Sequence, residues 1–171
     1  LAVQRLRKAG LRQGLLDLGG NLYCMGGAPG RDNWRVGIKN PRNRDELFAT
    51  VTISQASVAT SGSYERFVTI DGHHFGHIMN PATGRPAEGL LSATVIAKEG
   101  ILADGLSTTL FVLGPEAAVQ FLAEYYTDVD AVLVVPASAG DLDTVIATRG
   151  LRGRLNLLPG FENQYRIIFT D

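Results

Sequence analysis

The organisation of the chain is decided by residues 59–109, which read ATSGSYERF at 59–67, DGHHFGHIMNPATGRPAEG at 71–89 and LLSATVIAK at 90–98. The stretch then enters ADGLSTTLFVLG at 103–114. It holds all three histidines and two turns rich in Gly and Pro. Alternating and β-branched residues are typical of strands, and apolar residues at every third or fourth position are typical of an amphipathic helix. The stretch therefore predicts strands that lead through turns into a helix.

Finer signals divide this stretch into elements. The Asp71-Gly72 dipeptide indicates a hairpin between a strand at Tyr64–Ile70 and a returning strand at His73–Met79. Residues Leu90–Lys98 are expected to form a further strand, and Ile101–Leu113 a helix.

The flanking segments add more strands than helices. Helices are expected at Leu1–Ala9, at Pro115–Tyr126 with proline at its first position, and near Asp141–Thr148. Strands are expected at Gly14–Leu18, Asn21–Met25, Trp34–Lys39, Glu46–Ile53, Val58–Ser61, Ala131–Val135 and Tyr165–Phe169. Because strands cluster and helices do not alternate with them, the sequence predicts an α+β fold, with helices packed on a mixed or antiparallel sheet.

Composition narrows the class of protein. The chain has 171 residues, of which 45% are hydrophobic and 19% are charged, enough for one domain with a core. Sixteen basic and seventeen acidic residues give a net charge of −1, so nucleic acid is not an expected partner. No apolar run reaches the roughly 18 residues of a membrane span. The single cysteine, Cys24, excludes an internal disulfide and is expected to be a buried strand residue rather than a nucleophile.

Asp104 lies near the start of the predicted helix, with Ser107 and Thr108 three and four residues further on. That spacing places all three side chains on one face. Their oxygen atoms suit Mg²⁺, a hard cation that takes carboxylate and hydroxyl ligands and keeps some waters. The alternative is that Asp104 caps the helix and complements its dipole, which contributes about 0.5–2 kcal/mol. Spacing alone leaves both interpretations open.

The histidines differ in position. His73 and His74 follow the predicted turn and are expected at a hairpin tip, where adjacent strand residues point to opposite faces and do not readily share one metal ion. His77 ends the returning strand, where its side chain can face a ligand; the alternative is a hydrogen-bonded histidine at a strand end. Two segments, Gly19-Gly20-Asn21 and Ser61-Gly62-Ser63, would allow a ligand to approach the backbone closely.

Five motifs occur in one order along the chain: DLGGN at 17–21, WRVGIKNP at 34–41, ATSGSYERF at 59–67, HIMNPATGRP at 77–86 and ADGLSTTLFVLG at 103–114. In this order they resemble the C-terminal half of the ApbE-type FAD:protein FMN transferases, once described as thiamine-biosynthesis lipoproteins. The resemblance extends to about Val135. It implies an ApbE-like α+β fold that binds FAD and Mg²⁺ and transfers FMN from FAD to a threonine hydroxyl of a flavoprotein partner, releasing AMP.

The resemblance also implies roles for individual residues. Asp104 and Thr108 would be side-chain ligands of Mg²⁺, and Ser107 stands at a position that is sometimes a second carboxylate. His77 and Ile78 would lie against the flavin nucleotide, and His77 is a candidate to assist proton transfer. The nearby wall would include Gly19, Gly20 and Asn21.

The chain also departs from the family pattern. Ser63 and Asn80 stand where the family commonly has aspartate. The family's DLG-x-IAKG segment, which supplies a backbone metal ligand and a lysine, would lie before Leu1, because the DLGG at Asp17 is not followed by a lysine. Residues 1–171 are therefore expected to be the C-terminal portion of a single FMN-transferase-like domain.

These departures leave an alternative function, a non-catalytic or FAD-hydrolysing flavin-nucleotide-binding relative whose 171-residue piece is inactive alone. An absent half would uncover an apolar face, through which a homodimer is expected to form. The resemblance implies that the parent protein is exported and anchored to a membrane, on its periplasmic or outer face. A β-rich interaction module has only composition in its favour.

Overall fold

The computed structural model describes residues 2–63, 67–70, 73–138 and 141–171, with a short helix first, a run of strands, two central helices and closing strands. The helices are α1 (Ala2–Lys8), α2 (Gly100–Leu113), α3 (Pro115–Tyr125) and the 3₁₀ turn η1 (Arg149–Leu151). The strands are β1 (Gly14–Leu18), β2 (Asn21–Met25), β3 (Trp34–Asn40), β4 (Asn43–Ile53), β5 (Ala56–Gly62), β6 (Phe67–Ile70), β7 (His73–Gly76), β8 (Met79–Asn80), β9 (Arg85–Pro86), β10 (Ser92–Ala97), β11 (Asp130–Val135), β12 (Asp143–Ala147), β13 (Leu155–Leu157) and β14 (Tyr165–Phe169).

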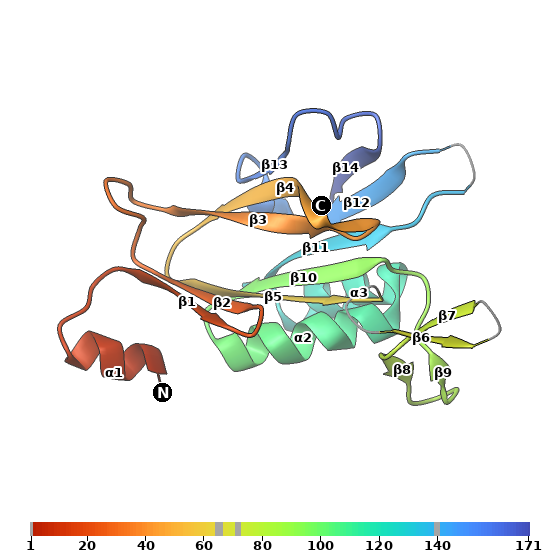
Figure 1. Cartoon of the computed structure of the whole chain (residues 1–171), viewed down its shortest axis with the longest axis horizontal. Helices are drawn as coiled ribbons and strands as arrows, with labels where there is room; N and C mark the ends of the chain where they lie inside the picture. The colour runs from red at the N-terminus through yellow and green to blue at the C-terminus, as the bar shows by residue number, and fades with distance from the viewer. Residues whose placement is uncertain (1, 64–66, 71–72, 139–140) are drawn as a thin grey trace.

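Strand pairing produces a large sheet and a small one. The large sheet has seven strands in the order β1-β2-β5-β10-β11-β12-β14, and the small sheet has three in the order β13-β4-β3. Neighbours in the large sheet are antiparallel except β12 and β14, which run parallel. The hairpins β6–β7 and β8–β9 pair separately and project from one end of the molecule in Figure 1.

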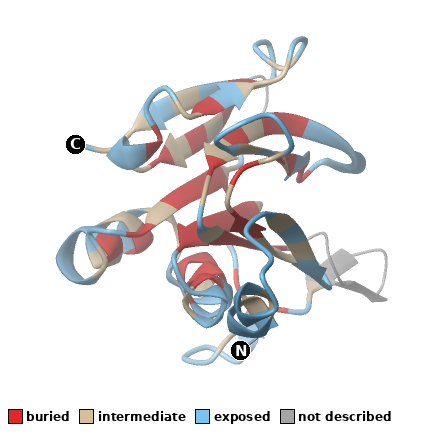
Figure 2. Ribbon diagram, turned by 90° about the vertical axis from the view of Figure 1, so that its left-hand side faces the viewer, coloured by how far each residue is buried: buried red, intermediate tan, exposed pale blue. Residues whose placement is uncertain are grey.

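The layers are built around β10, in which all six residues are buried. Alternate side chains of a strand point to opposite faces of its sheet. Ile96 joins the core between the two sheets, and Ala93 and Val95 join the core beneath α2 and α3. Figure 1 shows the resulting order of layers, which is small sheet, large sheet and helices, and Figure 2 shows the buried residues concentrated where the layers meet.

Helix α2 packs on the large sheet through residues spaced at the helical period. Gly114, with φ of 78°, follows the last residue of α2, and Pro115 then begins α3. In the described part of the chain, α2 and the shorter helices all fall short of the length and apolar character of a membrane-crossing helix. The residues of α2 buried against the sheet are Ala103, Leu106, Ser107, Leu110 and Phe111.

The prediction of an α+β fold, with a mixed, mostly antiparallel sheet and packed helices, is confirmed. The helix expected near Asp141–Thr148 is wrong, because Asp143–Ala147 forms β12. The sequence of β12, DTVIA, alternates buried and half-buried residues, which is the pattern of a strand. Strands β8, β9 and β13 were not expected, since their two or three residues give no periodic signal.

Two turns test the hairpin predictions. The strands expected at Gly14–Leu18 and Asn21–Met25 pair as β1 and β2. Gly19 and Gly20 form the two-residue turn between them, and both have positive φ, at 68° and 95°. Strands β6 and β7 pair as expected, with Ile70 opposite His73, whereas Asp71-Gly72 lies outside the described residues.

An ion pair fastens the β3–β4 hairpin to the large sheet. Arg42 donates from Nε to Asp143 Oδ2 at 2.6 Å and from Nη2 to Oδ1 at 2.7 Å. The backbone N–H of Ala137 donates to the same Oδ1 at 2.8 Å. Burial acts to raise the pKa of Asp143, but the donors, Arg42 foremost, outweigh it and lower that pKa below its ordinary value. Nearby, Tyr165 donates its hydroxyl to Asn40 Oδ1 at 2.7 Å, and burial raises the pKa of Tyr165 to about 12.

Arg42→Ala is expected to lower the free energy of unfolding by about 2 kcal/mol near neutral pH, because it leaves the buried Asp143 carboxylate without its charged partner. A carboxylate whose folded pKa is lowered stabilises the fold above its unfolded pKa, and this contribution is lost as pH falls through the folded value. The difference between wild type and variant should therefore shrink as pH falls below about 4. Urea unfolding across this pH range measures it. Arg44→Ala, an exposed arginine of the same hairpin, is the control, and an equal loss in both variants would contradict the prediction.

Candidate functional site

One face of the large sheet presents small polar residues to α2. Leu22 of β2 and Val58 of β5 contact the core between the sheets. Because side chains alternate along a strand, Asn21 of β2 and Ser61 of β5 lie on the opposite face, where the helices pack. The sheet therefore brings an amide and a hydroxyl to α2 from two neighbouring strands.

Asp104 contacts the first of these groups, the side-chain amide of Asn21. Asn21 Nδ2 donates a hydrogen bond to Asp104 Oδ1 at 3.1 Å. Helix α2 begins at Gly100, and its N-cap residue is Glu99, whose side chain makes no capping hydrogen bond. Asp104 therefore lies beyond the first turn, and the interpretation of Asp104 as a helix cap is wrong. Its exposed carboxylate is held by β2 and not by the end of its own helix.

Three hydroxyls lie beside Asp104. Ser61 Oγ is 2.9 Å from Ser107 Oγ and 3.0 Å from Thr108 Oγ1. Ser107 donates its own hydroxyl hydrogen to the backbone carbonyl of Asp104 at 2.9 Å. Ser107 is 1% exposed, whereas Thr108 is exposed. The structure thus brings together four of the predicted site residues, Asn21, Asp104, Ser107 and Thr108, and adds Ser61.

The Gly19–Gly20 turn places Asn21 at the start of β2. Gly20 N–H donates to Asp17 Oδ1 at 2.8 Å, which closes the turn. A Cβ added at Gly19 or Gly20 would meet no atom within 4 Å, so the positive φ and not crowding favours glycine at both positions. The open space beside this turn is compatible with the predicted approach of a ligand, which stays a prediction.

His77 and Ile78 lie on a different part of the molecule. His77 follows β7 and is exposed, while Ile78 is 8% exposed and belongs to the core under the helices. Ile78 also accepts a backbone hydrogen bond from Ala87 at 2.9 Å. Figure 1 shows the β6–β9 hairpins beyond one end of α2, whereas Asp104 lies in the first half of that helix. Contact of His77 and Ile78 with a flavin stays a prediction, and the side chains of His73 and His74 are not among those described.

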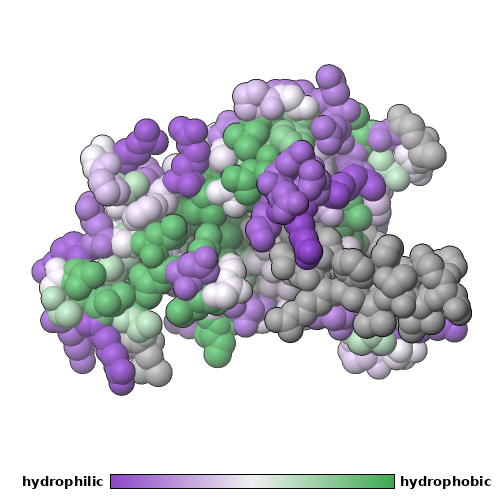
Figure 3. Space-filling view, in the orientation of Figure 1, coloured by the Kyte–Doolittle hydropathy of each residue, from purple (hydrophilic) through white to green (hydrophobic). Residues whose placement is uncertain are grey.

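A cavity of about 790 Å³ opens beside Asp104. Its volume and its mixed lining are typical of a small-molecule site. In Figure 3 apolar surface gathers over α1 and the β1–β2 hairpin, which flank this cavity. Its apolar lining residues include Val3, Leu16, Leu18, Leu22 and Ile101. Its polar and charged lining residues include Arg7, Asn21, Lys98, Glu99 and Asp104.

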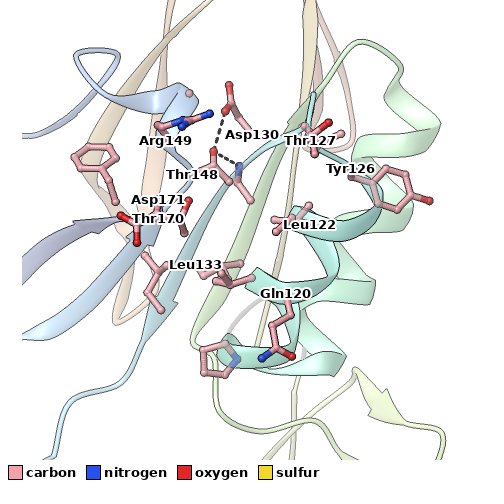
Figure 4. A pocket seen from close by; sticks show the side chains of 18 of the residues that line it. Gln120, Leu122, Tyr126, Thr127, Asp130, Leu133, Thr148, Arg149, Thr170 and Asp171 are labelled. Carbon is pink, nitrogen blue, oxygen red and sulfur yellow. Dashed lines mark hydrogen bonds between the residues drawn. The ribbon is translucent and has the colours of Figure 1, made fainter.

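A second cavity of about 840 Å³ lies between α3 and the strands β11, β12 and β14 (Figure 4). Leu122 and Leu133 contribute to its apolar wall. Asp130 accepts a hydrogen bond from Thr148 at 2.8 Å on its rim, and Arg154 donates to the same carboxylate at 2.9 Å. None of the predicted site residues lines this cavity, so we place the candidate site at the cavity beside Asp104.

The donor set around Asp104 fits a hard cation. Asp104 lines the cavity, whereas Thr108 lies one helical turn further along α2 and is not among the lining residues. In the part of the chain that the structure describes, no three His, Cys, Asp or Glu side chains cluster as ligands. Asp104 and Thr108 instead offer one carboxylate and one hydroxyl at neighbouring positions of a helix face. Mg²⁺ is commonly held by one or two carboxylates, with waters and phosphate oxygens completing its shell, so these residues suit Mg²⁺ shared with a phosphate ligand.

The ApbE family model matches residues 1–133 of the chain. An FAD:protein FMN transferase of Treponema pallidum is 39% identical over 158 residues, which are 84% of this chain and 43% of that protein. One of Rhodobacter capsulatus is 34% identical over 160 residues, which are 94% of this chain and 29% of that protein. The chain therefore belongs to the ApbE family. It spans less than half of the length of either relative.

Solved structures agree with this assignment. The flavin transferase ApbE of Vibrio cholerae superposes with a TM-score of 0.72 at 25% identity, over 89% of this chain and 47% of that one. The ApbE protein of Thermotoga maritima superposes with a TM-score of 0.67 at 28% identity, over 96% of this chain and 50% of that one. The predicted ApbE-like fold is confirmed.

Ser61 is the site residue that the sequence analysis did not identify as a donor. Its motif, SGS, was interpreted only as a place for close backbone approach. The available signal was the alternation in β5, which places Ser61 on the same face as Ala59 and hence toward the helices. The prediction that Cys24 is a buried strand residue is confirmed, because it lies in β2 with a fully buried side chain. This burial raises the pKa of the thiol to about 11.

Proposed function

We propose that residues 1–171 form the C-terminal portion of an FAD:protein FMN transferase, which moves FMN from FAD to a threonine hydroxyl of an acceptor flavoprotein in a Mg²⁺-dependent reaction that releases AMP. The observation that carries the proposal is the cluster of Asn21, Ser61, Asp104 and Thr108, of which Asn21 and Asp104 line a cavity of ligand size, in a chain of this family. The relatives in Treponema pallidum and Rhodobacter capsulatus are named FAD:protein FMN transferase, which supports the transfer of FMN from FAD to a protein.

The cavity suits a nucleotide carrying a pyrophosphate. Leu16 and Leu18 provide apolar surface for a ring system, and Arg7 and Lys98 bring positive charge to the same cavity. Lys98 is free to turn toward a phosphate, since its ion pair with Asp128 is long, at 3.7 Å, and largely exposed. A polyanionic ligand would therefore find both cationic side chains and apolar surface in this cavity.

Asp104 and Thr108 would hold the cation. A bound Mg²⁺ would offset negative charge on the non-bridging oxygens of the pyrophosphate as its bond breaks. The attacking hydroxyl belongs to the acceptor protein, so this chain has to position the phosphate and hold the cation and does not need its own nucleophile. His77 is proposed to lie at the flavin nucleotide and to assist proton transfer.

Ser63 and Asn80 favour a second candidate, an FAD-hydrolysing or only FAD-binding protein. Both stand where the resemblance implies aspartate. The side-chain oxygen of Asn80 accepts a hydrogen bond within its own turn, from Ala82 N–H at 2.9 Å. The absence of carboxylates at these two positions would alter how an acceptor hydroxyl or a water is received. Hydrolysis and transfer share the same metal and nucleotide site, so the two candidates differ only in which oxygen attacks.

A direct test incubates the intact protein with FAD, Mg²⁺ and a threonine-bearing acceptor, followed by intact-mass analysis of the acceptor and chromatography of the nucleotides. A mass gain of one FMN with equal release of AMP supports transfer. Release of FMN and AMP with an unmodified acceptor supports hydrolysis. Absence of both products, with several acceptor sequences tried, would overturn the proposal, and omission of Mg²⁺ is the control for the cation.

A further inference from the structure

The hydroxyls beside Asp104 form a chain with one direction. A hydroxyl has one hydrogen to donate and two lone pairs to accept with. Ser107 gives its hydrogen to the carbonyl of Asp104, which can only accept. The 2.9 Å contact between Ser61 and Ser107 must then use the hydrogen of Ser61. The 3.0 Å contact between Ser61 and Thr108 must in turn use the hydrogen of Thr108.

The direction of this chain decides what the Thr108 oxygen can offer to a ligand on the helix face that Thr108 shares with Asp104. With its hydrogen committed to Ser61, the Thr108 oxygen keeps its lone pairs for an electron-poor partner and turns no hydrogen toward a cation. Asp104 is oriented in a parallel way, since Asn21 donates to Oδ1 and leaves Oδ2 outside that contact. Both residues are therefore oriented as acceptors: Asp104 by Asn21 of β2, and Thr108 by Ser61 of β5.

We infer that Ser61 is a positioning residue that makes the Thr108 hydroxyl an obligate electron-pair donor for the cation held with Asp104. This inference rests on the proposed function, which places Mg²⁺ at these two residues. It also separates the roles of the two hydroxyls in α2: Thr108 is a ligand, and Ser107, 1% exposed with its hydrogen committed, is the anchor of the chain. Without Ser61 the Thr108 hydrogen is free to turn toward the cation or to bond the carbonyl one helical turn back.

The test is Ser61→Ala in the intact protein, with Mn²⁺ alone as the probe and electron paramagnetic resonance as the readout. The dissociation constant for Mn²⁺ should rise about 10-fold, which is the usual effect of removing a group that orients a metal ligand. Ser61→Thr, which retains the hydroxyl, should restore most of the affinity. Unchanged affinity in Ser61→Ala would overturn the inference.

Thr60→Val is the matched control. Thr60 is the neighbouring residue of β5 and its hydroxyl contacts that of Thr94 at 2.9 Å, so the variant also removes a hydroxyl pair from this strand. Thr60 lies on the other face of the sheet by alternation, away from α2. A loss of Mn²⁺ affinity equal to that of Ser61→Ala would show a general loosening of β5 and would overturn the inference.

A double-mutant cycle separates an effect through Thr108 from any other effect. In a Thr108→Ala background, Ser61→Ala should leave Mn²⁺ affinity unchanged within about twofold, because the group it positions is gone. A further 10-fold loss in that background would contradict action through Thr108. If the wild type binds no Mn²⁺ while FMN transfer is found, the metal site and this inference are both wrong, but the transferase activity stands. If Mn²⁺ binding depends on Asp104 but not on Ser61, the metal site stands and only this inference is wrong.

Discussion

Asp104→Asn is expected to reduce FMN transfer by about 100-fold or more, since it removes the one carboxylate among the proposed metal donors. The substitution is close to isosteric, and the asparagine oxygen can still accept the hydrogen bond that Asn21 donates to position 104. The fold and the contact with β2 should therefore survive while the negative charge is lost. Initial rates at several Mg²⁺ concentrations measure the effect, and the variant should need more Mg²⁺ to reach half of its maximal rate.

Asp45→Asn provides the control for this prediction. Asp45 lies in β4 of the small sheet with an exposed side chain, so the variant makes the same change of charge away from the cavity. Its transfer rate should stay within about twofold of wild type, as is usual for exposed positions. A rate for Asp104→Asn as high as that for Asp45→Asn would remove Asp104 from the proposed metal site.

Leu110→Ala is expected to lower the free energy of unfolding by about 3 kcal/mol, the largest effect on stability that we predict. Leu110 is fully buried and belongs to the core between the large sheet and the helices. It lies one turn beyond Ser107 on the stripe that docks α2, so its removal leaves a cavity directly under the helix that carries Asp104 and Thr108. Chemical denaturation followed by circular dichroism measures the loss.

Leu113→Ala makes the same chemical change three residues later in α2. Leu113 is 41% exposed, so its truncation removes little buried surface and should cost less than about 1 kcal/mol. Alanine has the highest helix propensity, so neither substitution weakens the helix itself. Similar losses in both variants would contradict the prediction that burial of Leu110 holds α2 on the sheet.

The parts of the fold that periodicity can specify were predicted well. The apolar run of β10 and the three-and-four spacing of α2 each give a long signal, and both elements formed close to the expected bounds. Short elements gave no such signal: β13 has three residues, and β8 and β9 have two each within a segment rich in turn-forming residues. A helix was expected near Asp141–Thr148, and pairing with β11 and β14 makes Asp143–Ala147 the strand β12 instead.

The candidate site residues were grouped by a different kind of signal. Ordered motifs, not spacing, indicated that Asn21, Asp104 and Thr108 belong together, and the structure places Asn21 and Asp104 in direct contact. Spacing within one helix could relate Asp104 to Thr108 but could not reveal a partner on another strand. Ser61 was missed as a donor because its SGS motif indicated only close approach of a ligand to the backbone. Alternation along the predicted strand Val58–Ser61 gives the face of Ser61 but not the residues of α2 that it contacts.

The contacts that orient the site join distant parts of the chain. Asn21 and Asp104 are 83 residues apart, and Ser61 and Ser107 are 46 apart. Contacts of such separation carry a large cost in loop-closure entropy and form only when the intervening structure is in place. A ligand that requires these donors together binds the native state and not the unfolded chain, so its concentration adds directly to conformational stability. Ligand affinity and conformational stability are therefore thermodynamically linked in this protein. A substitution far from the cavity would weaken the apparent binding of the ligand whenever it lowers the population of the folded chain.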